Sequence, residues 1–221
     1  MQKTYNNKLR IGFAGQTQVL LASPAGHCLD NNDGSTIAIQ DLYADMTVQT
    51  LQGPKKVRAV LYCHTDRTAG RLMCAMPTGD GSTLLVTPYH FVSLDRGCTW
   101  VYPAEQFPPN RYPEMHVPGF TEPVYSVQLA REARNDHPDA HSINVNGVWG
   151  VTMGHGLADV RAKEEDIRNH AFWGDHEAVS AGLDELDDGP NGHKIGYGTT
   201  LDEDKQSNGF ISKLASRGRI C

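Results

Sequence analysis

Hydrophobic and polar residues alternate over short stretches along residues 12 to 156 of the chain. A period of two is typical of strands with one buried and one exposed face. The pattern predicts strands at 17–22, 36–39, 46–50, 56–62, 71–76, 82–87, 123–129, 141–145 and 148–153, with a shorter one at 100–102. Many short strands separated by turn residues indicate an all-β domain.

Turn residues set the expected connections between these strands. Asn146-Gly147 is the strongest hairpin signal, because a two-residue type I′ turn needs positive φ at both positions. A second hairpin is expected across residues 78–81, and a tight turn at Gly53-Pro54. Residues 106–119 carry four prolines and are predicted to form a long irregular loop.

The pattern changes after Gly156. Residues 157–170 are charged and compatible with a helix. Asp175 can cap a second helix that runs to about Leu186, because apolar residues recur there at helical spacing. Residues 187–205 are polar and glycine-rich, which predicts a loop. The all-β domain is therefore expected to carry a partly helical C-terminal extension.

Composition limits the classes of partner and the cellular location. The chain has 221 residues, is 39% hydrophobic and has a net charge of −6. It has no run of lysine or arginine, so nucleic acid and anionic membrane surfaces are poor candidate partners. It also lacks an apolar segment long enough to cross a membrane and a recognisable signal peptide. We therefore expect an intracellular, cytoplasmic protein.

Cysteine and histidine spacing gives no support for a metal site. The five cysteines are odd in number and show no C-x-x-C spacing, which favours reduced thiols over disulfides or zinc. The one H-x-x-x-H spacing, His137 to His141, contains Pro138, which excludes the helix that would place both rings on one face. We expect no metal and no cofactor.

The candidate chemistry lies at the end of the strand predicted at 82–87. Thr87-Pro88-Tyr89-His90 places a hydroxyl and an imidazole three residues apart, where both can turn toward one point. The hydroxyl can bond one atom of a peptide, and the imidazole can give a proton to the leaving nitrogen. The common alternative is that both residues are structural, a threonine in the core and a histidine with its hydrogen bonds satisfied. The rest of the chain has to decide between the functional and the structural interpretation.

Several motifs in a fixed order resemble those of the Hint module, which hedgehog autoprocessing domains and inteins share. The motifs are Phe13-Ala-Gly-Gln-Thr-Gln-Val19, Asp33-Gly-Ser35, Ile39 to Thr50, Thr87-x-x-His90, Val124-Tyr-Ser-Val127 and His141 to Gly147. Three further patches are most similar to the Vint subgroup, which accompanies von Willebrand A domains: Trp100-Val-Tyr-Pro103, Met153-Gly-His-Gly156 and His170-Ala-Phe-Trp-Gly174. The resemblance covers roughly residues 12–175.

The resemblance implies a domain organisation. Residues 12–156 would form the Hint core, a pseudo-twofold all-β horseshoe. Residues 1–11 would be a leader or a stub of upstream polypeptide. Residues 157–221 would be an appendage packed on the core.

The family's chemistry is an N-to-S acyl shift, in which a cysteine attacks the carbonyl of its own preceding peptide bond. Water, a thiol or another small nucleophile then opens the thioester, and no cofactor takes part. By resemblance, Thr87 would bond the scissile amide and His90 would protonate its nitrogen, with the acid form of His90 within reach near neutral pH. His141 and His155 are possible further site residues. The substrate would be the chain's own upstream polypeptide.

The sequence departs from the family at the nucleophile. Gly12 stands where the family has cysteine, and glycine cannot accept the acyl group. Either an introduced change traps the uncleaved precursor, or this is a natural module that has lost the nucleophile and is kept for binding; the intact Thr87 and His90 favour the first. Residues 154–156 contain no asparagine, which disfavours splicing. Ser126 lies where inteins commonly carry aspartate, and it would be a poor acid or base.

Three functions stay open from the sequence. The first is single-turnover self-cleavage in cis by the parent with cysteine at position 12, and whether this chain itself acts as an enzyme is left undecided. The second is a non-catalytic Hint-fold interaction module. The third is a hydrolase acting in trans, in which His90 pairs with one of three cysteines: Cys63, Cys74 or Cys98.

Overall fold

The all-β prediction is confirmed. The computed structural model describes residues 12–22, 34–64, 70–131, 137–157, 167–168, 170–197, 199–201 and 207–212. Within these ranges the larger sheet has eight strands in the order β13-β5-β10-β1-β7-β6-β9, with β4 paired to β5. Its strands are β1 Phe13–Ala14, β4 Thr47–Thr50, β5 Gly53–Cys63, β6 Arg71–Pro77, β7 Thr83–Val86, β9 His116–Phe120, β10 Val124–Leu129 and β13 Lys194–Gly196.

A second sheet of five strands has the order β3-β2-β11-β12-β8, and β14 pairs with β15 apart from both. These strands are β2 Gln18–Leu20, β3 Thr36–Ala38, β8 Val92–Ser93, β11 Ser142–Val145, β12 Val148–Val151, β14 Thr199–Leu201 and β15 Ser207–Phe210. The helical segments are η1 Ile39–Asp41, α1 Pro103–Gln106, η2 Pro113–Met115, η3 Pro138–His141, α2 His176–Asp184 and η5 Pro190–Gly192. No helix in the described part of the chain is long and apolar enough to span a membrane.

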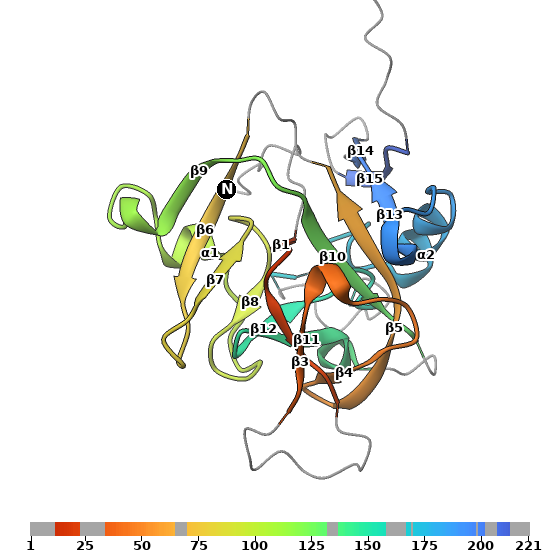
Figure 1. Cartoon of the computed structure of the whole chain (residues 1–221), viewed down its shortest axis with the longest axis horizontal. Helices are drawn as coiled ribbons and strands as arrows, with labels where there is room; N and C mark the ends of the chain where they lie inside the picture. The colour runs from red at the N-terminus through yellow and green to blue at the C-terminus, as the bar shows by residue number, and fades with distance from the viewer. Residues whose placement is uncertain are drawn as a thin grey trace, which may run out of the picture.

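The short strand β1 occupies the centre of the larger sheet (Figure 1). Phe13 lies opposite Tyr125 of β10 on one side and opposite Val86 of β7 on the other, both in antiparallel register. A strand of two residues therefore joins the two halves of the sheet. Residue 12, which immediately precedes it, lies at the middle of the fold.

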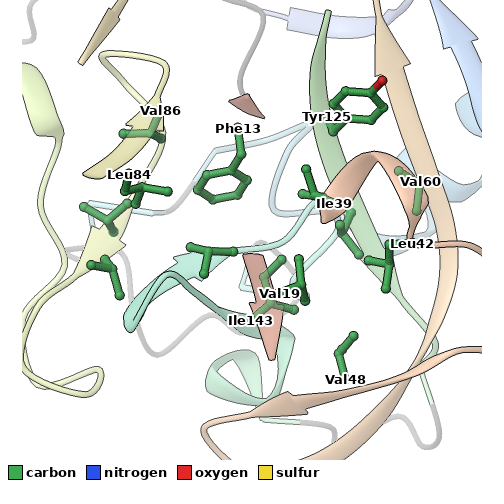
Figure 2. Packing of buried hydrophobic residues seen from close by; sticks show 14 of the residues in the cluster. Phe13, Val19, Ile39, Leu42, Val48, Val60, Leu84, Val86, Tyr125 and Ile143 are labelled. Atoms are coloured by element: carbon green, nitrogen blue, oxygen red, sulfur yellow. The ribbon is translucent and has the colours of Figure 1, made fainter. Parts of the chain in front are cut away.

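One hydrophobic core is shared by the two larger sheets (Figure 2). The ring of Phe13 is 1% exposed and belongs to the same buried cluster as Val19, Val86 and Ile143. Burying a side chain of this size stabilises a fold by about 1.5–3 kcal/mol. The alternating pattern of the sequence predicts this arrangement, since each strand turns its apolar side chains to the shared interior.

The helix α2 packs against a second buried cluster, which also contains side chains of β5 and β10. Val179 and Leu183 of the helix are fully buried beside Leu61 and Val124. The Asp175 side chain accepts a hydrogen bond of 2.9 Å from Ala178 N–H, so the predicted cap is confirmed. The extension predicted from residue 157 onward thus contributes side chains to the same interior as the β-strands.

Two segments predicted to be loops contain strands. β9 forms within residues 106–119 and beyond, and it pairs with β6 at the edge of the sheet. Its Pro118 lacks an N–H group, which an edge strand tolerates because one side makes no ladder bonds. β13 forms within residues 187–205 and runs parallel to β5. A lone parallel partner far away in the sequence leaves no local hairpin signal.

Turn chemistry is confirmed in two hairpins and wrong in a third. The hairpin predicted across residues 78–81 joins β6 to β7, where Pro77 pairs with Thr83. Asn146 and Gly147 have φ of 50° and 78°, as the predicted turn between β11 and β12 requires. The turn between β4 and β5 is formed by residues 51–52, because Gln49 pairs with Pro54 and Thr50 with Gly53. The strand expected at 100–102 reduces to one bridge between Val101 and Val92. The helix-compatible segment 157–170 lies mostly outside the described residues.

Leu183→Ala tests whether α2 and the strands form one cooperative unit. The side chain is 0% exposed, so its removal should lower the free energy of unfolding of the whole domain by about 2–5 kcal/mol, in a single transition. Chemical denaturation monitored by tryptophan fluorescence and by circular dichroism measures this. Leu94→Ala is the control, because Leu94 is 52% exposed and its loss should change stability by under about 0.5 kcal/mol. A separate early transition for the helix would contradict the shared interior.

Candidate functional site

Thr87 connects the two other residues of the candidate site, Gly12 and His90. Gly12 N–H donates to Thr87 Oγ1 at 3.1 Å, and Thr87 N–H donates to the Gly12 carbonyl at 3.0 Å. His90 N–H in turn donates to the Thr87 carbonyl at 3.2 Å. All three residues are buried. The nitrogen of the peptide bond between residues 11 and 12 therefore lies against a buried hydroxyl.

The local sequence explains why Thr87 and His90 come together. The bond from His90 N–H to the Thr87 carbonyl closes a four-residue turn, and Pro88 occupies its second position, where the fixed φ of proline is favoured. Pro88 also ends the strand β7, since it has no N–H to donate. The freed carbonyl of Pro88 accepts a bond of 2.9 Å from Ala104 N–H, which ties the turn to α1.

The hydrogen bonds of His90 define which ring nitrogen carries the proton. Nε2 lies 2.9 Å from the Val151 carbonyl, and a carbonyl oxygen only accepts, so Nε2 carries the hydrogen. In the neutral ring Nδ1 then has a lone pair, and this atom is buried without a hydrogen-bond partner. The ring of Phe13 packs edge-on against the imidazole, with centroids 4.2 Å apart. Nδ1 is thus the atom that can take up and release a proton.

Burial changes the acid–base properties of His90. Removal from water disfavours the charged ring and lowers its pKa to about 4, although the bond to the Val151 carbonyl acts in the opposite direction. The expectation that its acid form is within reach near neutral pH is therefore wrong. At pH 7 the ring is neutral, and its conjugate acid gives up a proton more readily than an ordinary imidazolium.

Gly12 lies in a space that barely admits a side chain. A β-carbon built on its backbone would lie 2.6 Å from the Tyr125 carbonyl oxygen and 3.1 Å from Ser126 Oγ. The first distance is too short for a real contact, so a larger residue at position 12 needs a small movement of the backbone there. The second distance shows that a side chain at position 12 points toward Ser126.

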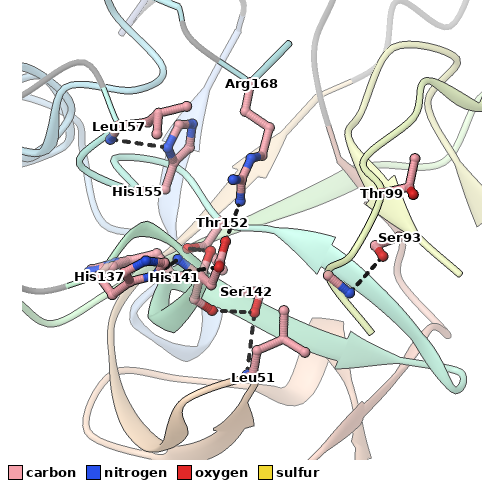
Figure 3. Close-up of polar contacts among 12 residues, drawn as sticks. Leu51, Ser93, Thr99, His137, His141, Ser142, Thr152, His155, Leu157 and Arg168 are labelled. Atoms are coloured by element: carbon pink, nitrogen blue, oxygen red, sulfur yellow. Dashed lines mark hydrogen bonds and ion pairs between the residues drawn. The ribbon is translucent and has the colours of Figure 1, made fainter. Parts of the chain in front are cut away.

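The structure places His141 and His155 in other surroundings (Figure 3). Both are buried, and the ring of His141 lies 5.9 Å from the ring of His176. The His141 carbonyl accepts two bonds from Thr152, one from N–H and one from the hydroxyl. His155 Nδ1 accepts a long bond of 3.4 Å from Leu157 N–H. These contacts give both histidines a role in the packing of the chain, whereas Gly12, Thr87 and His90 are linked directly.

The cysteines give no support to a hydrolase acting in trans. One sulfur–imidazole contact within the described ranges joins Cys74 Sγ to His116 Nδ1 at 3.7 Å. Cys74 is fully buried, and burial raises the pKa of its thiol to about 11, so the reactive thiolate does not form near pH 7. Cys63 is also buried, and Cys98 is exposed.

Metal binding has no clear site among the residues that the structure describes. No group of three or more His, Cys, Asp or Glu side chains there is arranged to hold an ion.

Two contributors to the site, Val151 and Phe13, were missed from the sequence. The Val151 carbonyl fixes the tautomer of His90, and every residue type supplies a carbonyl, so no sequence signal exists for it. The Phe13 ring reaches the imidazole only because β1 pairs with β7 and β10, and that pairing is non-local.

The pKa of His90 predicts a pH dependence of stability. The ordinary value is 6.5 and the folded value about 4, so between them the unfolded chain binds more protons. The contribution of a neutral His90 is complete above pH 6.5 and decreases as the pH falls toward 4. The difference in pKa corresponds to about 3 kcal/mol. Denaturant unfolding from pH 7.5 to 4 should show this loss.

His90→Gln should remove that part of the slope. His176, whose pKa burial also lowers, contributes equally in both proteins, so the difference between them isolates His90. Leu94→Ala, which changes an exposed side chain that does not titrate, is the control and should keep the original slope. Equal slopes for His90→Gln and the unmodified chain would show that His90 is not the buried neutral group described above.

Comparison with known proteins gives a family and a set of structural neighbours. The family model "Vint: Hint-domain" matches residues 12–210. Among curated proteins, no sequence matches the chain. A variant of the Ssp DnaB mini-intein is 17% identical over 65% of this chain and 97% of that chain, with a TM-score of 0.42. The MchDnaB-1 intein is 15% identical over 63% of this chain and 99% of that chain, with a TM-score of 0.39.

The gp41-1 intein is 9% identical over 65% of this chain and 100% of that chain, with a TM-score of 0.36. The family match covers most of the sequence and begins at Gly12, the first described residue. The resemblance to the Hint module found in the sequence is therefore confirmed. The chain belongs to the Vint family of Hint domains.

Proposed function

We propose that the parent of this chain, with cysteine at position 12, cleaves its own polypeptide in cis at the junction between residues 11 and 12. The observation that carries the proposal is the bond from Gly12 N–H to Thr87 Oγ1, which lies inside the protein at the centre of the larger sheet. A buried hydroxyl on the nitrogen of one particular peptide bond fixes the orientation of that bond. The substrate is the upstream polypeptide of the same molecule.

The proposed first step is an acyl shift from nitrogen to sulfur. The thiol of the residue at position 12 attacks the carbonyl carbon of residue 11, so that a C–S bond forms and the C–N bond breaks. The thiol proton ends on the leaving nitrogen. His90 Nδ1 is suited to carry it, because the neutral ring can accept a proton and the low pKa favours its release to an amine.

The proposed second step opens the thioester. Water, a thiol or another small nucleophile attacks the acyl carbon, the C–S bond breaks, and the upstream polypeptide leaves. The residue at position 12 then has a free amino group, so each molecule reacts once. Residues 154–156 supply no asparagine for cleavage of a second junction, which makes the reaction cleavage without splicing.

The chain with Gly12 should remain uncleaved. Its hydrogen bonds to Thr87 are present, but glycine supplies no atom that can accept the acyl group. The chain thus keeps the hydrogen bonds that would orient the peptide bond but lacks the nucleophile for the first step.

A second candidate function, a non-catalytic interaction module, is favoured by the crowding at Gly12. A β-carbon on residue 12 would lie 2.6 Å from the Tyr125 carbonyl oxygen, so the surrounding backbone leaves room for glycine but not for a larger residue. In a module that has lost its nucleophile, the neighbouring backbone can pack tightly against glycine because no side chain has to fit at position 12. The two candidates differ in whether cysteine at position 12 restores cleavage.

Gly12→Cys, with a reporter fused upstream of residue 12, should cleave immediately after residue 11. Dithiothreitol and hydroxylamine should accelerate the reaction, because both attack thioesters and leave ordinary peptide bonds intact. His90→Ala in this protein should slow cleavage by about 10²–10⁴, the usual effect of a positioned acid or base. Thr87→Ala should cost less, about 0.5–1.5 kcal/mol, since it removes one neutral hydrogen bond. Gel electrophoresis and mass spectrometry of the products measure the rate and the cleavage site.

The matched control is the unmodified Gly12 protein with the same reporter, which should stay intact under all these conditions. A Gly12→Cys protein with the native circular dichroism spectrum that still does not cleave with thiol present would exclude the self-cleavage proposal. The interaction module would then be the better account.

A further inference from the structure

We infer that Phe13 is a positioning residue for His90, and that Gly150 of β12 forms a notch that seats the phenyl ring. This assignment rests on the proposed function, because it concerns how the proton carrier of the first step is held. Phe13 directly follows position 12, so one side chain connects the strand that carries the junction to the imidazole that would serve it.

Gly150 leaves room for the tip of the Phe13 ring. A β-carbon built on Gly150 would lie 2.5 Å from Phe13 Cζ, which is too short for a real contact, and 3.3 Å from Cε1. The backbone itself does not require glycine there. Gly150 pairs with Ile143 and Val92 in antiparallel ladders, and its φ lies outside the left-handed region. The missing side chain of Gly150 therefore serves the Phe13 ring.

The same phenyl ring packs against His90. The two ring centroids are 4.2 Å apart, and the ring planes meet at 61°. Figure 2 shows the Phe13 side chain pointing from β1 into the buried cluster, where it is 1% exposed. The ring thus contacts the notch in β12 and the imidazole at once, and filling the notch would displace it from His90.

β12 also holds His90 directly. Val151, the residue after Gly150, accepts the bond of 2.9 Å from His90 Nε2, and its N–H donates to the Phe91 carbonyl at 3.1 Å. Two consecutive residues of one strand therefore fix the imidazole, Val151 through a hydrogen bond and Gly150 through the ring that it seats.

A phenyl ring in this place has two effects on the imidazole. It fills space into which the imidazole could turn, which keeps Nε2 on the Val151 carbonyl and leaves Nδ1 as the proton-accepting atom. It also excludes water, and burial is the largest cause of the low pKa of His90, about 4. Both effects depend on the ring filling its space, because a hydrocarbon ring offers the imidazole no hydrogen bond.

Tyr125 and Cys74, ionisable side chains of the same buried cluster, are uncharged at pH 7. Tyr125 lies opposite Phe13 on β10, and burial raises its pKa to about 12. Cys74 lies on β6, and burial raises the pKa of its thiol to about 11. The pKa of His90 is set by its burial and by the Val151 bond, and Phe13 supplies part of that burial.

The direct test is histidine NMR of the unmodified Gly12 chain, which lacks a nucleophile. The ¹⁵N shifts of an imidazole report its tautomer and, followed with pH, its pKa. The chain has ten histidines, so the signals missing from His90→Gln identify His90. Phe13→Leu should admit water, raise the pKa of His90 by about one unit or more toward 6.5, and mix the two tautomers. Gly150→Ala, which displaces the ring, should do the same.

Val48→Ala is the matched control. Val48 is 0% exposed in the same buried cluster, and it lies on β4, apart from Phe13 (Figure 2). Its truncation should lower the stability of the protein and leave the pKa and the tautomer of His90 unchanged.

The double variant Phe13→Leu with Gly150→Ala tests the notch. Leucine is shorter than phenylalanine, so it leaves space at Gly150 that a methyl group can occupy. Gly150→Ala should therefore lower the midpoint of urea unfolding in the Phe13 chain and have little effect in the Phe13→Leu chain. Equal losses in both chains would show that Gly150 does not seat the ring.

The second readout is the pH profile of cleavage in Gly12→Cys chains. Phe13→Leu should slow cleavage near pH 7 by up to about 10-fold for each unit of increase in the His90 pKa, because a weaker acid releases its proton less readily. The acid limb of the profile should move to higher pH by the shift that NMR measures. A purely structural loss would lower the rate by one factor at every pH.

The outcomes separate this assignment from the proposed function. If Phe13→Leu leaves the tautomer and the pKa of His90 unchanged, the assignment is wrong even if Gly12→Cys cleaves. If both change as expected and no Gly12→Cys chain cleaves, the assignment stands and the proposed function fails. Should Gly150→Ala not fold, the double variant decides: its folding supports the notch and its failure overturns it. Should Phe13→Leu not fold, Phe13→Met, which keeps more of the volume, replaces it in every measurement.

Discussion

The architecture depends on the pairing of one two-residue strand, β1, between β7 and β10. This pairing joins the halves of the larger sheet and buries the Phe13 ring in the core between the sheets. It also brings the nitrogen of Gly12 to the Thr87 hydroxyl, because Thr87 directly follows β7. The residues around β1 therefore both hold the larger sheet together and form the candidate site, so a change at the site also affects the sheet.

The environment of His90 shows how burial sets the chemistry of this site. Its ring bonds to a backbone carbonyl, packs against a phenyl ring and contacts little water. Desolvation is the largest influence on its pKa, and the bond to the Val151 carbonyl only partly offsets it. A buried neutral imidazole with one fixed tautomer is suited to transient proton transfer, whereas a solvent-exposed histidine would hold a proton in a large fraction of molecules near pH 6.

Local signals in the sequence predicted what depends on local physics. The Asn146-Gly147 turn, the hairpin across residues 78–81 and the Asp175 cap each follow from residues within about four positions of one another. β9 and β13 were missed because a proline within an edge strand and a short parallel pairing have no local signature. The approach of Gly12 to Thr87 came from the family resemblance, and the low pKa of His90 requires the packed structure around it.

The bond between His90 and Val151 spans 61 positions of the chain. Val151 ends β12, so the imidazole acquires its tautomer only after the hairpin of β11 and β12 has been synthesised and has docked on the first half of the domain. In a parent chain with cysteine at position 12, the peptide bond at the amino terminus of the domain would therefore stay intact on the ribosome until late in translation. Cleavage would therefore depend on completion of the fold.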